Sequence, residues 1–361
     1  MTPLQDTPPK SIAHGGPLSL EALSTEVAAI HSALGILWAP EESLLLVRGE
    51  DAGTFLGGLT TNHVKALAEG RLQGNLLCGN KGKILHTLDV ARLPGGQFVL
   101  LTEPGELSPV AAHLEAYHVR EAMEIGQLPL ARVDLLGPGA GAALNALLPD
   151  PRQTVGSFQG GPLIVFEHPV LAFPRRVALL PPERLAAFSE ALVSAVPGAR
   201  RVGVQALDEA RIQAGLPRFG QDYDGDFLPA EAALYDRISF NKGCYVGQEI
   251  HARLHWRGKV NRKLMAVRLD ANAAANLTPG AALYHADQAV GTLTSLARLN
   301  SGGHRAAIAL VRLQGLEGVS ALTLTPGGEP VAFLHLLATD LGAKPSAAPS
   351  AAPASMGASA P

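Results

Sequence analysis

The sequence changes character near residue 260, and this change constrains the fold more than any other feature. Before that point, segments with helical hydrophobic spacing alternate with short apolar runs that are typical of strands. From Arg262 onward only short strand-like runs remain, separated by Gly, Pro, Asn and Asp. This division predicts an α+β region over residues 19–255 and a separate all-β module, a sandwich or small barrel, over residues 256–338.

Hydrophobic periodicity and turn residues locate the individual elements. In the α+β region, helices are expected at 19–34, 104–119 and 182–196, and a short helix at Phe55 and Leu56. Strands are expected there at 43–48, 72–77, 84–93, 97–102, 130–136 and 163–167. In the all-β module they are expected at 264–269, 289–296, 306–313, 321–325 and 331–336.

Composition limits the classes of partner. The 361 residues carry 29 basic and 32 acidic side chains, which argues against a surface that follows a nucleic-acid backbone along its whole length. No segment has the apolar run of a secretory signal or a transmembrane helix, so we expect a cytoplasmic protein with no membrane partner. Residues 1–18 and 339–361 lack the composition for a core and are expected to be disordered.

The chain has two cysteines, Cys78 and Cys244. They stand far apart with no C-x-x-C pairing, so two reduced thiols are expected rather than a disulfide. Two thiolates are also fewer than the four that usually hold an iron-sulfur cluster. Any cluster chemistry would therefore require a partner protein.

Cys244 lies in a stretch, residues 241–262, that combines glycines with cationic side chains. Gly243 and Gly247 would allow a tight turn that exposes the thiol, with Lys242 beside it as a cation. A helix beginning near Val246 would place the thiol close to a helix N-terminus, and both influences favour the thiolate. A free cysteine is most often a small buried core residue, and from these residues alone the two interpretations are about equally supported.

The same stretch contains candidate metal ligands and a run of cations. Cys244, His251 and His255 could suit zinc, but the charges of Arg253, Arg257 and Lys259 oppose a divalent ion, and no metal is expected. The cations are usually a solvated face; here they could instead hold the carboxylates of a small anionic ligand. A short contact with RNA stays open.

Several motifs in this part of the chain resemble one known family. They are K-G-C-Y-V-G-Q-E at residues 242–249, A-R at 252–253, R-G-K-V at 257–260, R-I-Q-A-G-L-P-R-F-G at 211–220 and L-P-A-E at 228–231. The sequence resembles the YgfZ family of folate-binding proteins, a branch of the folds typified by the T-protein of the glycine cleavage system. The octet is specific, and the match extends from about residue 40 to about residue 335.

The resemblance implies a ring of two α+β lobes and a C-terminal β-barrel around a hole that binds tetrahydrofolate or a one-carbon derivative. It implies that Glu231 contacts the pterin, and a carboxylate can accept two donors from an aminopyrimidine edge. Lys259 matches a cation directed toward the glutamate tail of the folate. Gln248 and Arg253 belong to the same implied set of cofactor contacts.

The resemblance also implies an accessory role in assembling or maintaining iron-sulfur enzymes, including tRNA-modifying ones. Cys244 would be the reactive thiol or a transient ligand, with Lys242 favouring the thiolate. The expected partners are iron-sulfur client or carrier proteins and folate, and tRNA contact is not expected.

One segment departs from the T-protein pattern. The glycine-rich G-G-I-x-D segment of T-proteins aligns with residues 82–86, where His86 stands in place of the acid and Asp89 lies nearby. This departure disfavours glycine-cleavage aminomethyl transfer. A folate-dependent aminomethyl or one-carbon transferase is the alternative function.

Overall fold

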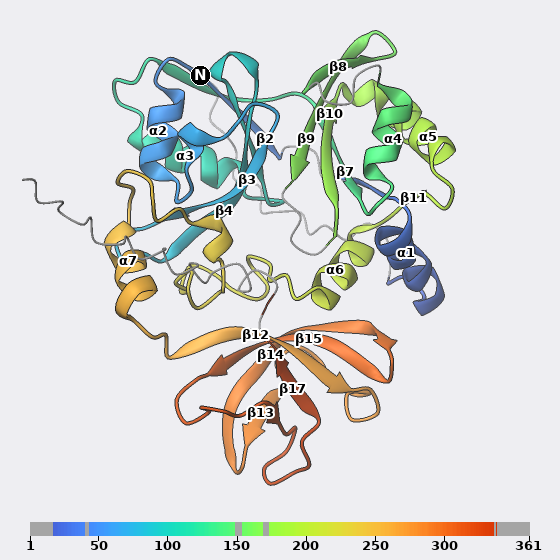
Figure 1. The fold of residues 1–361 in the computed structure, drawn as a ribbon, viewed down its shortest axis with the longest axis vertical. Helices are drawn as coiled ribbons and strands as arrows, with labels where there is room; N and C mark the ends of the chain where they lie inside the picture. Colours follow the sequence, from blue (N-terminus) through green and yellow to red (C-terminus); the bar gives the residue numbers. More distant parts are fainter. Residues whose placement is uncertain (1–16, 40–42, 149–153, 169–172, 336, 338–361) are drawn as a thin grey trace, which may run out of the picture.

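The computed structural model describes residues 17–39, 43–148, 154–168, 173–335 and 337. Figure 1 shows them as three lobes around a central region, with two lobes of helices and sheet above and a lobe of strands below. The expected disordered segments, residues 1–18 and 339–361, lie almost entirely outside the described residues. No helix in the described part of the chain is both long and apolar enough to cross a bilayer.

The first lobe is a five-stranded antiparallel sheet with the order β3-β4-β5-β2-β6. Its strands are β2 (Leu44–Gly49), β3 (Leu72–Cys78), β4 (Ile84–Arg92), β5 (Phe98–Thr102) and β6 (Met123–Gln127). Two helices, α2 (Ala52–Leu59) and α3 (Leu107–Tyr117), bury apolar side chains against this sheet. In α3, Val110 and Leu114 are one turn apart and both fully buried, which is why this helix lies on the sheet.

The second lobe is a six-stranded sheet with the order β11-β1-β7-β10-β9-β8, antiparallel except for the pair β1 and β11. Its strands are β1 (Gly35–Trp38), β7 (Ala131–Leu136), β8 (Val155–Phe158), β9 (Gly161–His168), β10 (Arg175–Leu180) and β11 (Arg200–Arg201). Its helices are α1 (Leu20–Ser32), α4 (Ala140–Leu147), α5 (Leu185–Ala195) and α6 (Val204–Gln213). Helices α4 and α5 share one core with the sheet, and α1 and α6 share another.

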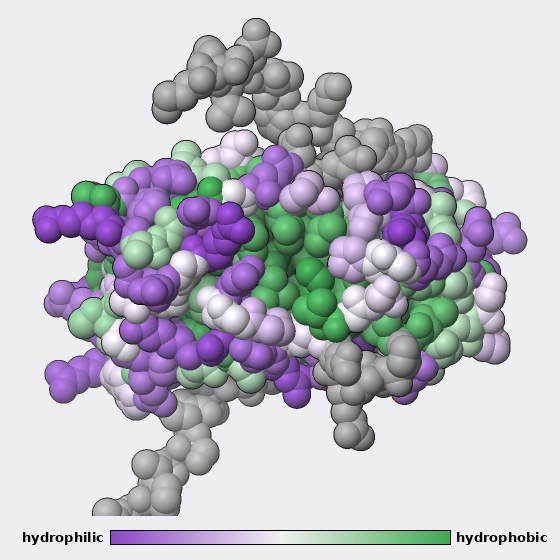
Figure 2. Space-filling model, turned by 90° about the horizontal axis from the view of Figure 1, so that it is seen from above, coloured by the Kyte–Doolittle hydropathy of each residue, from purple (hydrophilic) through white to green (hydrophobic). Residues whose placement is uncertain are grey.

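The two sheets pack against each other through one apolar cluster. Leu72, Val99 and Leu101 of the first lobe meet Phe166 and Val177 of the second in this cluster, and all five side chains are buried. Seen from the side opposite the strand-only lobe, apolar surface gathers in a hollow between the two lobes, bordered by hydrophilic side chains (Figure 2).

The third lobe is an antiparallel sheet with the order β13-β14-β15-β12-β17-β16. Its strands are β12 (Arg262–Asp270), β13 (Ala282–His285), β14 (Gln288–Ser301), β15 (His304–Arg312), β16 (Ala321–Leu322) and β17 (Ala332–His335). A bridge between Tyr284 in β13 and Thr323, directly after β16, joins the two outer strands. The sheet is therefore a nearly closed barrel, and the predicted all-β module is confirmed.

Helix α7 (Gln248–Arg257) connects the central region to the barrel, and residues 214–247 pass through that region mostly as turns (Figure 1). Four short 3₁₀ helices complete the described elements: η1 (Val64–Ala66), η2 (Pro94–Gly96), η3 (Pro182–Arg184) and η4 (Tyr235–Arg237).

Most of the predicted elements are confirmed, and the differences have local causes. The helix expected from residue 104 begins at Leu107, because Gly105 has a φ of +83° and turns the chain first. Strands β1, β6, β8, β10, β11 and β13 and helix α6 were not predicted. Strand β10 begins with two arginines, whose charge hides a segment that is buried from Val177 onward.

Candidate functional site

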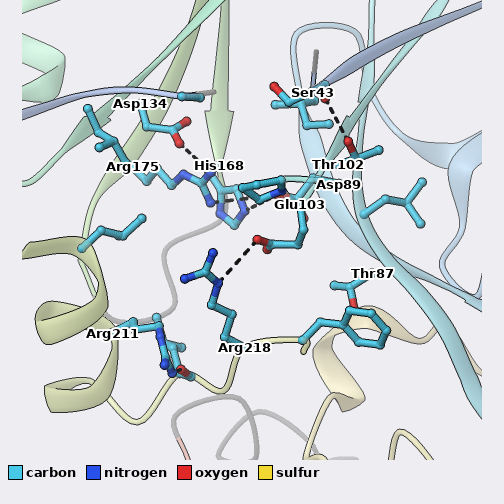
Figure 3. A pocket seen from close by; sticks show the side chains of 18 of the residues that line it. Ser43, Thr87, Asp89, Thr102, Glu103, Asp134, His168, Arg175, Arg211 and Arg218 are labelled. Carbon is cyan, nitrogen blue, oxygen red and sulfur yellow. Dashed lines mark hydrogen bonds and ion pairs between the residues drawn. The ribbon is translucent and has the colours of Figure 1, made fainter. Parts of the chain in front are cut away.

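A cavity of about 220 Å³ lies where the two α+β lobes meet the central region. Strands β4, β7 and β10, the end of β5, helix α6 and the loop that follows α6 all contribute to its walls. Leu37, Leu101, Phe173 and Phe219 supply apolar surface, while arginines and carboxylates supply the charge. Figure 3 shows Asp89, His168 and Arg175 gathered on one side, with Arg218 reaching toward Glu103.

Asp89 is the most enclosed carboxylate of the first lobe in this cavity, with 8% of the residue exposed. Its Oδ1 accepts a hydrogen bond from Arg237 Nη1 at 3.1 Å, and its Oδ2 lies 3.4 Å from His168 Nε2. Burial alone would raise the pKa of Asp89, but the charges of Arg237, His168 and Arg175 hold it well below its ordinary value. Asp89 is therefore ionised at neutral pH.

Arg237 reaches Asp89 by passing over Gly74 of strand β3, which has no side chain. Gly74 pairs with Asp89 in the register of β3 and β4, and a Cβ at Gly74 would lie 2.9 Å from the Arg237 side chain. The absence of a side chain at Gly74 therefore opens the path that Arg237 takes into the cavity.

A second buried carboxylate of the cavity, Asp134 on β7, belongs to the second lobe. Arg132 approaches it with two nitrogens, at 3.2 and 3.0 Å, and Arg175 donates to it at 3.1 Å. Burial would raise the pKa of Asp134, but the two arginines lower it. Arg175 lies between Asp134 and Asp89, so the two lobes share one buried network of charges.

Glu103 and Arg218 form the most exposed ion pair of this cavity among the described residues. Arg218 Nε lies 3.8 Å from Glu103 Oε2, beyond hydrogen-bond distance, and 35% and 40% of the two side chains are exposed. Both groups retain hydrogen-bonding capacity that a ligand could use. Arg218 lies on the loop after α6, and Glu103 directly follows β5.

Arg211 fixes that loop against the barrel. Its Nη1 donates to Asp222 at 2.7 Å, and its Nη2 donates to Ser295 of β14 at 3.0 Å. Ser295 in turn donates to Asp222 at 2.7 Å. This buried, fully paired cluster holds the segment that carries Arg218 in place. In the R-I-Q-A-G-L-P-R-F-G stretch, the first arginine therefore anchors the loop and the second reaches the cavity.

Cys244 is exposed, whereas its neighbours in the sequence are anchored inward. Tyr245 is 7% exposed, and its hydroxyl lies 3.2 Å from Nδ1 of His251. His251 Nε2 lies 2.8 Å from the carbonyl oxygen of Gly82, so this nitrogen carries the proton and Nδ1 accepts from Tyr245. The buried alternative for Cys244 is therefore wrong. Cys78 is the buried core cysteine, and burial raises the pKa of its thiol to about 12.

Lys242 anchors the other side of the same turn. Its ammonium donates to the carbonyl oxygens of Gly57 and Thr60 at the C-terminal end of α2, at 2.7 and 2.5 Å. Burial lowers the pKa of Lys242 to about 8. These contacts give Lys242 a helix-capping role, and its action on the Cys244 thiol stays a prediction.

Gly247 is required by the geometry of this turn. It has a φ of +84°, and a Cβ there would lie 2.8 Å from the carbonyl oxygen of Gly79. Gly243 has no such contact and no positive φ, so only one of the two predicted glycines is needed for conformation. Helix α7 begins directly after Gly247, four residues beyond Cys244.

The predicted folate contacts do not belong to the lining of this cavity. Glu231, Gln248, Arg253 and Lys259 are not among the described residues that line it, and neither is Cys244. Glu231 accepts from Arg262 Nε at 3.0 Å and from the Leu228 amide at 2.9 Å. Gln248 begins α7, while Arg253 and Lys259 are exposed. Their roles in cofactor binding stay predictions.

Five residues that line the cavity were not predicted from the sequence: Glu103, Asp134, His168, Arg175 and Arg218. Four of them lie at the end of a strand or in a loop, whereas Asp134 lies within β7. Arg218 belongs to the R-I-Q-A-G-L-P-R-F-G motif, and the other four belong to none of the motifs. An available signal was polar residues inside apolar strand segments, such as Asp89 in β4 and Asp134 in β7. His86, the residue aligned with the T-protein acid, does not line the cavity; it pairs with Glu106 at 2.6 Å.

Comparison with known proteins identifies the fold. Residues 16–167 match the model of the GCVT N-terminal domain. The crystal structure of glycine cleavage system aminomethyltransferase T from Bartonella henselae superposes with a TM-score of 0.71 over 88% of this chain and 89% of that chain, at 21% identity. The chain has the T-protein fold. The expected architecture of two α+β lobes and a C-terminal barrel is thereby confirmed.

Two curated proteins with sequences similar to this chain have different names, one of an aminomethyltransferase and one of an assembly factor. The aminomethyltransferase of Chlorobium chlorochromatii is 27% identical over 306 residues, 79% of this chain and 82% of that protein. The human mitochondrial iron-sulfur cluster assembly factor IBA57 is 28% identical over 320 residues, 82% of this chain and 83% of that protein. The two similarities are nearly equal, so the functional distinction depends on the residues of the site.

Proposed function

We propose that this protein is a folate-binding accessory factor of the YgfZ branch, which supports the assembly or repair of iron-sulfur enzymes through Cys244. The observation that carries the proposal is the turn at Cys244: Lys242 and Tyr245 are anchored inward, and the thiol between them is exposed. A thiol on a fixed turn outside the cavity is accessible to another protein. The similarity to the human assembly factor supports the same role.

Tetrahydrofolate is the proposed ligand of the cavity, and the residues there fit its chemistry. Glu103 can accept hydrogen bonds from the aminopyrimidine edge, and Arg218 can pair with a carboxylate of the glutamate tail. Both side chains are available because they are 3.8 Å apart, too far to form a hydrogen bond with each other. The volume of about 220 Å³ lies below the usual range for small-molecule sites of about 300–1,000 Å³, so the ring would fill it and the tail would extend outward. Bound tetrahydrofolate supplies amine nitrogens that can carry a one-carbon unit.

The alternative is a folate-dependent aminomethyl or one-carbon transferase. Asp89 supports it, because this carboxylate, three residues beyond the aligned segment 82–86, lines the cavity. The contacts of Asp89 argue against the transferase. Arg237 and His168 already contact its two carboxylate oxygens, and its lowered pKa makes Asp89 a weak base and a poor acid at neutral pH. Turnover of an aminomethyl or methylated substrate with tetrahydrofolate by the purified protein would establish the transferase and overturn our ranking.

The accessory role is tested by replacing Cys244 with Ala in cells that depend on this protein. We expect folding and tetrahydrofolate affinity to be unchanged, while the activities of iron-sulfur enzymes fall. Cys78→Ala is the control, because Cys78 is 1% exposed and its loss should lower stability without abolishing iron-sulfur enzyme activity. Full activity in the Cys244→Ala cells would refute the role of this thiol.

The ligand is tested separately with purified protein. Calorimetric titration with tetrahydrofolate should give binding that weakens about tenfold in Arg218→Met, through loss of one charge-assisted contact. Arg48→Met is the control, since Arg48 is an exposed arginine paired with Glu124, away from the residues lining the cavity. If the wild-type protein fails to bind any reduced folate, the ligand assignment is wrong.

A further inference from the structure

An exposed aromatic surface lies beside the Cys244 turn, and the proposed chemistry does not use it. The ring of His255 stacks on Phe240, with centroids 3.9 Å apart and an interplanar angle of 16°. Trp256 meets the edge of His255 at 4.7 Å, and Tyr235 lies 5.8 Å from His255. These four rings, here called the aromatic cluster, join the end of α7 to the segment that leads into the turn.

Trp256 is the exposed member of the aromatic cluster. It is 64% exposed, whereas the other tryptophan, Trp38, is partly buried and donates to Ser189 at 2.7 Å. Leaving a tryptophan in water forgoes the burial of a large apolar side chain. Exposed tryptophans are also frequent anchors of protein interfaces, where few residues supply most of the binding energy.

Cations surround Trp256. Arg253 and Arg257 precede and follow it at spacings that place all three on one face of α7, and Lys259 lies two residues beyond. All three cations are exposed, and within the described chain none has an ion pair within 4.0 Å. Glu249 is the single acid of α7. The surface is therefore positive on a chain whose net charge is −3.

The aromatic cluster and Cys244 are close enough for one partner to cover both. Phe240 precedes Cys244 by four residues, so their Cα atoms are at most about 14 Å apart. A standard protein interface buries about 800 Å² on each partner, which corresponds to a patch about 30 Å across.

We propose that Trp256, with Arg253, Arg257 and Lys259 around it, docks an acidic segment of the protein that Cys244 serves. The inference rests on the proposed function, because it assigns a binding surface to that partner. A protein fits better than a nucleic acid, because affinity for a nucleic-acid backbone grows with the number of phosphates neutralised, and Arg253, Arg257 and Lys259 would neutralise few. Charge attracts the partner, and burial of the indole retains it.

Titration of the purified full-length protein with a short synthetic peptide of Glu, Leu and Phe tests the surface. Binding is followed by the anisotropy of a dye attached to the peptide, so that the signal does not depend on Trp256, and added salt should weaken binding. We expect at least about tenfold weaker binding in Trp256→Ala and in the charge reversal Arg257→Glu. Arg200→Glu, an exposed arginine on β11 in the second lobe, is the matched control and should bind as wild type.

Two further probes make the result decisive. A peptide with Lys in place of Glu should not bind, and a short single-stranded RNA should bind more weakly than the acidic peptide. Absence of acidic-peptide binding, or equal binding by Trp256→Ala, overturns the proposal. Tighter binding of the RNA also overturns it and assigns the surface to nucleic acid.

Separate variants distinguish this inference from the proposed function. Cys244→Ala should bind the acidic peptide as wild type does, while cells carrying it lose iron-sulfur enzyme activity. Trp256→Ala should keep its tetrahydrofolate affinity but reduce the same activity. If Cys244→Ala cells retain full activity, the proposed function fails, whereas the peptide titration alone decides whether the docking surface exists.

Discussion

Glu231 and Arg262 join the central region to the first strand of the barrel. Arg262 Nε donates to Glu231 Oε1 at 3.0 Å, and 14% of the glutamate side chain and 35% of the arginine side chain are exposed. Arg262 also lies over the ring of Phe227, 4.4 Å from its centroid. The acid that the resemblance assigns to the pterin thus holds the central region against the barrel.

A double-mutant cycle with Glu231→Gln and Arg262→Met should therefore show strong coupling. We expect a coupling free energy of about 1–2 kcal/mol in urea unfolding, between the values typical of exposed and of buried pairs. Independent effects of the two substitutions would contradict this structural role. The same variants test the pterin contact, because a role limited to Glu231 would weaken tetrahydrofolate binding in Glu231→Gln and not in Arg262→Met.

Asp89→Asn should destabilise the protein by about 3 kcal/mol, because it leaves the buried charges of Arg237 and Arg175 without their shared partner. The pKa of Asp89 is lower in the folded state than its ordinary value of about 3.9. The contribution of ionised Asp89 to the free energy of unfolding is therefore fully present above about pH 4 and is lost as pH falls further. Urea unfolding of wild type and variant from pH 7 downward checks this.

The control for Asp89 is Glu183→Gln, which removes an exposed carboxylate. Its stability should match that of wild type within about 0.5 kcal/mol. An Asp89→Asn protein as stable as this control would mean that the cavity charges do not depend on Asp89.

Local pattern was sufficient to predict an α+β region followed by an all-β module, whereas the division into two α+β lobes came from the family resemblance. The alternation of helices and strands, and the change near residue 260, depend on which side chains must be buried, so the sequence carries them directly. The Cys244 turn was also found, because Gly247 and the charged residues near it are adjacent in the chain. The cavity was not, since Asp89, Arg175 and Arg218 come from three distant segments.

The direction of the Lys242 side chain also could not be predicted from the sequence. Lys242 is two residues from Cys244, and sequence proximity suggested an electrostatic pair. Its ammonium instead donates to Gly57 and Thr60, which lie more than a hundred residues earlier. Only the tertiary arrangement brings the C-terminal end of α2 to Lys242.

Lys242→Met tests the capping role of this residue. Methionine keeps most of the apolar stem but leaves the carbonyls of Gly57 and Thr60 without their donor, so we expect a loss of about 1–2 kcal/mol in unfolding free energy. Lys81→Met, at an exposed lysine, is the matched control and should be neutral. The rate at which iodoacetamide alkylates Cys244, measured against pH, tests the separate effect on the thiol. An unchanged pH profile would limit Lys242 to the structural role.

His251 should make the Cys244 turn sensitive to acid. Burial lowers the pKa of His251, although its hydrogen bond to Gly82 acts in the opposite direction. As pH falls below the ordinary value of about 6.5, the unfolded chain takes up the proton first, so the stability that neutral His251 provides is lost on acidification. Protonation of Nδ1 also removes the acceptor for the Tyr245 hydroxyl.

The melting-temperature difference between wild type and His251→Gln should therefore shrink from pH 7.5 to pH 5.5, since glutamine does not titrate. The thiolate fraction of Cys244 falls with pH in both proteins, so the informative quantity is the ratio of the wild-type alkylation rate to the His251→Gln rate. This ratio should change over the same range, because only the wild-type protein releases Tyr245 from the turn. His285→Gln removes an exposed histidine and should behave as wild type in both measurements. If His251→Gln keeps the wild-type pH dependence, the acid sensitivity comes from another histidine, and the Tyr245–His251 contact only positions the thiol.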